Sequence, residues 1–140
     1  PEATMLKALM NHLVLARNEV VVMDMEAGIE HLGRATSGSV DALIVVVNPG
    51  QRSRVAADKI RRLGRDIGIK NIVVIGNRVR TEADKIMIRE SMPDYTILGF
   101  IPEMDEIVTA DRNGKRPFED ISRIPEELKE ITQKLLALAK

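Results

Sequence analysis

Four short apolar runs, rich in β-branched residues, recur along the chain and constrain its fold more than any other feature. Uninterrupted valine and isoleucine are typical of strands that are buried on both faces of a parallel sheet. Charged stretches with apolar residues at helical spacing separate the runs, and this alternation implies right-handed crossovers. The sequence therefore predicts an α/β fold, with a mostly parallel sheet covered by helices on both faces. The runs are EVVVMDM at 19–25, DALIVVVNPG at 41–50, NIVVIGNRV at 71–79 and YTILGFIP at 95–102.

Helices are predicted before, between and after these runs. No internal repeat or linker divides the chain, so we expect a single domain over residues 1–140. Ser122 is the predicted N-cap of the last helix, because serine is favoured at that position. The helix after the second run has an apolar stripe of Val55, Ile60, Leu63 and Ile67. The helices are expected within 3–17, 29–36, 51–69, 82–92 and 104–112, and from 122 onwards.

Composition narrows the class of protein. Lysine plus arginine balance aspartate plus glutamate at 21 each, so no global field draws the chain to nucleic acid or anionic lipid. The sequence has no cysteine, which excludes disulfides and thiolate metal sites within its 140 residues. No apolar run is long enough to span a bilayer, and we expect a cytoplasmic protein.

Polar and small residues follow each predicted strand. In open parallel sheets, ligands bind beyond the carboxyl ends of the strands, so these residues are the candidate binding site. Asp24 ends the first run, where a carboxylate could hold hydrated Mg²⁺ or orient water; the alternative is that it caps the following helix. The candidates after the four runs are Asp24, Glu26 and Gly28, then Asn48, then Asn77 and Arg78, then Pro102 and Glu103.

Three segments carry a resemblance to a known family. VVVMDMEAGIEHLGRATSGSVDALIVVVNPGQRS at 20–53, NIVVIGNRV and GFIPEMDEIVTADRNGKRPF at 99–118 resemble the CooC-type nickel-maturation ATPase of carbon monoxide dehydrogenase. DMEAGIEHLGR is the distinctive part. The other segments are shared across the deviant-Walker P-loop group, which includes the MinD, ParA and nitrogenase iron proteins.

The resemblance implies a function and a set of partners. It implies an ATP-binding maturation factor that uses ATP or ADP and Mg²⁺, and whose nucleotide-dependent homodimer delivers nickel to carbon monoxide dehydrogenase. Asp24 matches the catalytic acid of the switch that senses the γ-phosphate, and Glu26 and Gly28 belong to the same switch. Asn77, with Arg78 behind it, matches the asparagine that reads the adenine edge. Pro102 and Glu103 match the loop whose backbone flanks the base.

Two motifs of that family are missing from these 140 residues. The glycines form no phosphate loop of the kind K-G-G-x-G-K-T, and there is no C-x-C pair to bind nickel or zinc, so no metal ligand is predicted here. We therefore expect the carboxy-terminal portion of such an ATPase, incomplete at its N-terminus. Phosphate loops hold the triphosphate through many charge-assisted hydrogen bonds, so the isolated chain is expected to hydrolyse ATP poorly or not at all.

Other functions of the same fold stay open as alternatives. The chain could be a MinD- or ParA-like ATPase, or an inactive scaffold that binds DNA, a membrane or a partner protein. The stretch 51–69 is strongly basic, but a solvated helix face is favoured over DNA binding. The last helix is amphipathic, and packing on the sheet is favoured over membrane binding. We therefore predict neither a nucleic-acid nor a membrane partner.

Overall fold

The computed structural model describes residues 19–24, 40–116 and 125–138. Within them, three parallel strands form one sheet in the order β1 (Leu43–Val47), β2 (Ile72–Val79) and β3 (Thr96–Pro102). These are the second, third and fourth apolar runs of the sequence. The predicted α/β fold with a parallel sheet is confirmed.

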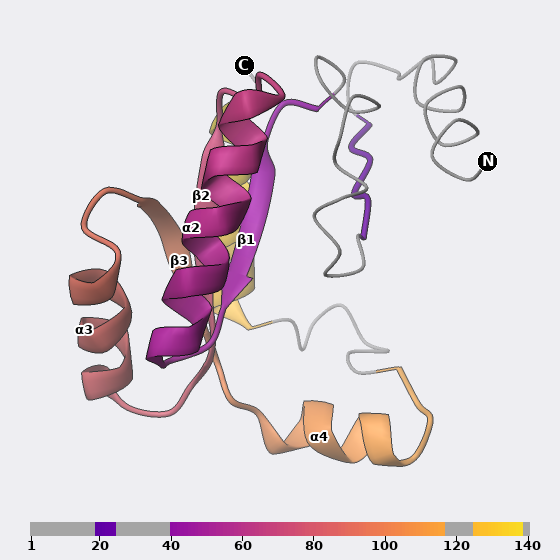
Figure 1. Cartoon of the computed structure of the whole chain (residues 1–140). Coiled ribbons are helices and arrows are strands. Elements are labelled where there is room, and N and C mark those ends of the chain that lie inside the picture. The colour runs from indigo at the N-terminus through magenta and orange to yellow at the C-terminus, as the bar shows by residue number, and fades with distance from the viewer. Residues whose placement is uncertain (1–18, 25–39, 117–124, 139–140) are drawn as a thin grey trace.

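Helices cover both faces of this sheet (Figure 1). On one face lie α2 (Gln51–Asp66) and α3 (Glu82–Ser91), and on the other lies α5 (Glu126–Leu138), while α4 (Asp105–Arg112) extends beyond the end of the sheet and buries no residue. On one face, Ala57 of α2 and Ile88 of α3 are buried with Val45, Val47 and Val74 of the sheet. On the other face, Ile131 of α5 is buried against Val73, Ile75 and Leu98. Because β2 contributes valine to both clusters, its apolar run does not alternate with polar residues.

The last helix packs as predicted. Ile131 is buried on the sheet, with Leu135 and Leu138 partly buried beside it, so the apolar stripe of α5 faces protein. The helix begins at Glu126, and Ser122, the predicted cap, lies outside the described residues. No helix in the described ranges is long and apolar enough to cross a membrane.

The predicted strand at 20–23 is wrong. The segment 19–24 has no secondary structure, the side chains of Val20, Val21 and Val22 are exposed, and the segment lies apart from β1 (Figure 1). A β-branched run becomes a strand only when a neighbouring strand completes its hydrogen-bond ladder. In the described part of the chain β1 pairs only with β2, and 19–24 does not join the outer edge of β1.

The stripe predicted for α2 is also partly wrong. Val55 and Leu63 are exposed, whereas Ala57 and Gly64 are buried and Ile60 is partly buried against the core. Small residues make this contact because the helix lies very close to the sheet. A Cβ atom at Gly64 would be 2.8 Å from Cδ1 of Ile72, so a larger side chain would force the end of the Ile72 side chain to shift.

Candidate nucleotide-binding edge

The carboxyl ends of the three strands meet at one edge of the sheet. The register pairs Val47 of β1 with Gly76 of β2, and Gly76 with Phe100 of β3. The residues that follow therefore lie side by side, as expected for parallel strands. Five of the predicted site residues are brought to this edge: Asn48, Asn77, Arg78, Pro102 and Glu103.

The end of β2 is irregular where Asn77 and Arg78 stand. The register with β3 shifts between Gly76 and Val79, and Arg78 has φ 56°, in the left-handed region. This conformation costs a residue with a side chain roughly 1–2 kcal/mol. Irregularities of this kind bend a strand and redirect its side chains, and they are common beside binding sites.

A glycine starts the helix that follows β1. Gly50, at the N-cap position of α2, has φ 136°, which other residues rarely adopt, and no side chain caps the helix there. Asn48 is exposed between the end of β1 and this turn. The amino end of α2 is therefore close to the end of β1, on the edge that carries the other polar residues.

Glu103 is the centre of an ion-pair cluster at this edge. Nε of Arg80 donates a hydrogen bond to Oε2 of Glu103, and Nε of Arg78 lies 3.8 Å from Oε1. The backbone N–H of Glu103 also donates to the carbonyl of Val79, at 3.0 Å. The hydrogen bond from Arg80 is the main reason that the pKa of Glu103 is lowered, and the same bond raises the pKa of Arg80.

A capping box continues this network into α3. Thr81 is the N-cap, and its Oγ1 accepts from the N–H of Asp84 at 3.3 Å, while Oδ2 of Asp84 accepts from the N–H of Thr81 at 2.9 Å. The same Oδ2 accepts from the N–H of Arg80 at 2.8 Å. This bond from Arg80 is the largest cause of the lowered pKa of Asp84.

The sequence reading missed Arg80. The T-x-x-D spacing of Thr81 and Asp84 is a readable sign of a capping box, but nothing in the sequence links Arg80 to Glu103, 23 residues further on. Their contact depends on the parallel pairing of β2 with β3. Only the folded chain brings the ends of these two strands together.

A cavity of about 480 Å³ adjoins this cluster, along the outer side of β3 between α3 and α5. Arg80 and Pro102 line one part of it, and Lys134 of α5 lines another. Nζ of Lys134 donates to the carbonyl of Leu98 at 2.9 Å, and the guanidinium of Arg89 lies 4.8 Å from the centre of the Phe100 ring. The cavity thus borders the polar edge, but most of its wall is formed by α3, β3 and α5.

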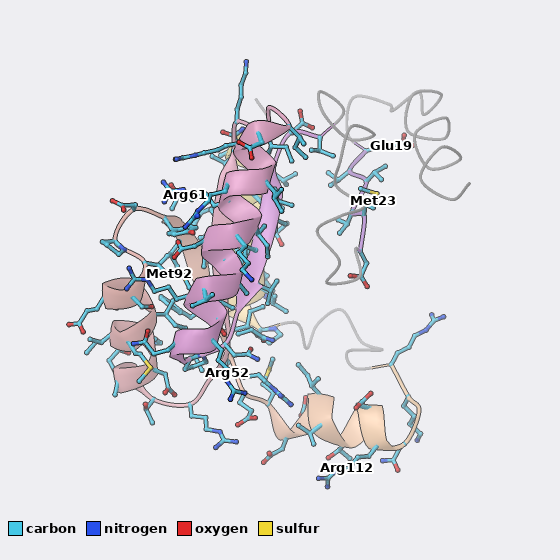
Figure 2. The ribbon with its side chains drawn as sticks, in the orientation of Figure 1. Glu19, Met23, Arg52, Arg61, Met92 and Arg112 are labelled. Atoms are coloured by element: carbon cyan, nitrogen blue, oxygen red, sulfur yellow. The ribbon has the colours of Figure 1, made fainter. Side chains whose placement is uncertain are left out.

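Asp24, one of the three predicted switch residues, is not brought to the edge. Asp24 is exposed in the segment 19–24, which does not join the sheet, and neighbouring Met23 lies away from α2 and β1 (Figure 2). Glu26 and Gly28 lie outside the described residues. In the ranges that the structure describes, no group of three or more histidine, cysteine, aspartate or glutamate residues is placed to hold a metal ion.

Two of the basic residues on α2 have partners within the protein. Nε of Arg54 lies 3.9 Å from Oδ2 of Asp58. Arg61 projects from α2 (Figure 2), and its guanidinium lies 4.4 Å from the centre of the Tyr95 ring. The hydroxyl of Tyr95 donates to Asp58 at 2.7 Å. Through these contacts Arg54 and Arg61 help to hold α2 against Tyr95, next to the start of β3.

Acidification is expected to weaken the Glu103 cluster. The folded pKa of Glu103 lies below its ordinary value of 4.5, so its contribution to stability is present above that value and lost as pH falls through the lowered pKa. The free energy of unfolding, measured with urea from pH 7 down to pH 3, should therefore fall less steeply at the acid end in Glu103→Gln. Glu90→Gln, at an exposed glutamate on α3, is the control. Identical profiles for the wild type and Glu103→Gln would contradict the prediction.

No protein-family model matches the chain. It is 38% identical over 141 residues to an uncharacterized ATP-binding protein of Methanocaldococcus jannaschii, covering 99% of this chain and 54% of that protein. It is 41% identical over 114 residues to the carbon monoxide dehydrogenase accessory protein CooC of Rhodospirillum rubrum, covering 81% of this chain and 43% of CooC.

Solved structures give the same picture of the fold. The MinD cell division protein of Aquifex aeolicus superimposes with a TM-score of 0.63 at 25% identity, over 80% of this chain and 49% of MinD. The chain thus spans about half the length of the curated and structural relatives that it matches here.

Proposed function

Because the chain belongs to the CooC- and MinD-like group of P-loop ATPases, we propose that its polar sheet edge binds the base of ATP or ADP. One observation carries this proposal: the parallel register puts Asn77 and the Pro102–Glu103 loop at the same edge. The amide side chain of Asn77 carries both a donor and an acceptor, so it can recognise the donor and acceptor pattern of a base.

The roles of the edge residues follow from their chemistry. The Asn77 amide would pair with the adenine edge, with Arg78 beside it. The backbone at Pro102 and Glu103 would flank the base, and Asn48 would lie towards the sugar and phosphates. The exposed carboxylate of Asp24 is an oxygen ligand of the kind that Mg²⁺ accepts together with phosphate oxygens and water. Asp24, Glu26 and Gly28 would form the switch that responds to the γ-phosphate once the segment 19–24, which does not join the sheet here, moves to this edge.

The finer function that we propose is nickel insertion into carbon monoxide dehydrogenase by a cytoplasmic homodimer. It is supported by the similarity to an accessory protein of that enzyme, CooC, together with the distinctive DMEAGIEHLGR segment. Nickel would be cargo here. The 140 residues contain no cysteine, so they offer no thiolate ligand for it, and this chain would contribute the nucleotide-responsive part of the cycle.

The proposal predicts a localised response to adenine nucleotides. We expect millimolar ADP, and not CDP, to shift the amide NMR signals of Asn77, Arg78 and Glu103. Asn77→Ala should weaken ADP binding by roughly three- to tenfold, since one hydrogen-bonding side chain is lost. Asn113→Ala, at the carboxyl end of α4, removes an exposed asparagine away from this edge and is the matched control. A response centred on the amino ends of the strands, or equal for both nucleotides, would contradict the proposal.

A further inference from the structure

The two arginines that contact Glu103 are not equivalent. Arg80 donates a hydrogen bond to one carboxylate oxygen, whereas Arg78 lies at ion-pair distance from the other, 3.8 Å away. A hydrogen bond between charged groups has a defined geometry, and a longer ion pair leaves the side chain freer to move. Arg80 therefore holds Glu103, while Arg78 is the arginine that can turn to another anion or acceptor.

Arg80 is itself anchored at its backbone. Its N–H donates to the Asp84 carboxylate in the capping box at the start of α3. Its side chain then reaches across to Glu103 in the segment after β3, and the N–H of Glu103 donates a hydrogen bond back to the carbonyl of Val79 at the end of β2. One continuous set of contacts thus joins the start of α3, the end of β2 and the segment after β3.

We propose that Arg80 is a positioning residue for base recognition: through Glu103 it fixes the Pro102–Glu103 loop beside Asn77 and leaves Arg78 available to the ligand. This inference rests on the proposed binding of a nucleotide base at the same edge. Arg80 does not touch the base itself. It determines how far the loop backbone stands from Asn77, and so which base fits between them.

The exposure of the three side chains separates this role from a general contribution to stability. The side chains of Arg78 and Arg80 are 60% and 73% exposed, and that of Glu103 is 21% exposed. Ion pairs this open to water make only a small contribution to global stability, which is the part that acid titration of Glu103 measures. The effect of Arg80 should therefore be largest at the loop that it holds. The lowered pKa of Glu103 and the raised pKa of Arg80 are consistent with such a contact.

The first test needs no ligand. In Arg80→Met, hydrogen exchange of the Glu103 amide should be roughly two- to fivefold faster than in the wild type, because the loop opens more often. Arg80→Lys keeps the charge and should restore part of the protection, and Arg78→Met should have a smaller effect. Lys85→Met is the matched control, because Lys85 on α3 pairs with Glu82 and not with Glu103. Unchanged exchange in Arg80→Met would overturn the proposal.

The second test measures base selectivity. The ratio of the dissociation constants for CDP and ADP should fall roughly two- to fivefold in Arg80→Met, recover partly in Arg80→Lys and stay unchanged in Lys85→Met. A role in stability alone would leave this ratio unchanged, and that result would overturn the positioning role. If the wild type binds ADP and CDP equally, the proposed base site is wrong. The exchange rate of the Glu103 amide then still shows whether Arg80 holds the loop.

Discussion

Replacing Ile88 by alanine is expected to lower the free energy of unfolding by about 2–5 kcal/mol. Ile88 is 1% exposed and belongs to the core cluster under α2 and α3, with Val45 and Val74 of the sheet. The substitution removes apolar surface and leaves a cavity that close-packed neighbours fill only in part. Urea denaturation of the two proteins at the same pH measures the difference.

The adjacent residue gives a matched control. Met87 on the same helix is 48% exposed, so Met87→Ala should change the free energy of unfolding by no more than about 0.5 kcal/mol. Both substitutions put alanine into α3, and their effects on helix propensity are small by comparison. Similar losses in the two variants would mean that α3 does not present Ile88 to the sheet.

Replacing Gly76 by alanine is expected to destabilise the protein by about 1–3 kcal/mol through overpacking. A Cβ atom there would lie 2.5 Å from Cδ1 of Phe100, closer than real Cβ contacts allow, and 3.0 Å from Cδ1 of Ile88, which is tighter than most. Gly76 is buried in β2 and directly precedes Asn77. The movement that relieves the clash should therefore disturb the proposed base site as well, and amide shifts at Asn77 would report it.

A second substitution tests the cause. Phe100→Val in the Gly76→Ala background removes the Cδ1 atom that clashes, so it should restore part of the lost stability even though Phe100→Val alone is destabilising. Four urea denaturation curves give the coupling free energy of the pair. Purely additive losses would show that contact with Phe100 is not the source of the Gly76→Ala effect.

Much of the fold could be predicted from local patterns. The runs at 41–50, 71–79 and 95–102 became β1, β2 and β3, because their β-branched residues fit a sheet that is covered on both faces. The polar residues that follow them lie at one edge as expected, since parallel strands end on the same side. The prediction that residues 1–140 form one domain remains open.

Two predictions failed because neighbours decided the outcome. Val20 to Met23 have the same local character as the residues of β1, yet they form no strand, because no ladder joins them to the sheet in the described part of the chain. Val55 and Leu63 fit a helical stripe, yet α2 turns Ala57 and Gly64 to the sheet. Hydrophobic spacing does not reveal how closely a helix will pack, and close packing favours the small residues.

The sequence by itself determined the α/β class, the three strands that form the described sheet and the family of the chain. The fold class, the strands and the family can be recognised from residue periodicity and from motifs in continuous stretches of sequence. Only the tertiary structure decided that Arg80, rather than Arg78, makes the hydrogen bond to Glu103, and that Asp84 anchors the backbone of Arg80. Such contacts are set by strand register and by the irregular end of β2, because a shift of one residue in pairing would point different side chains at each other.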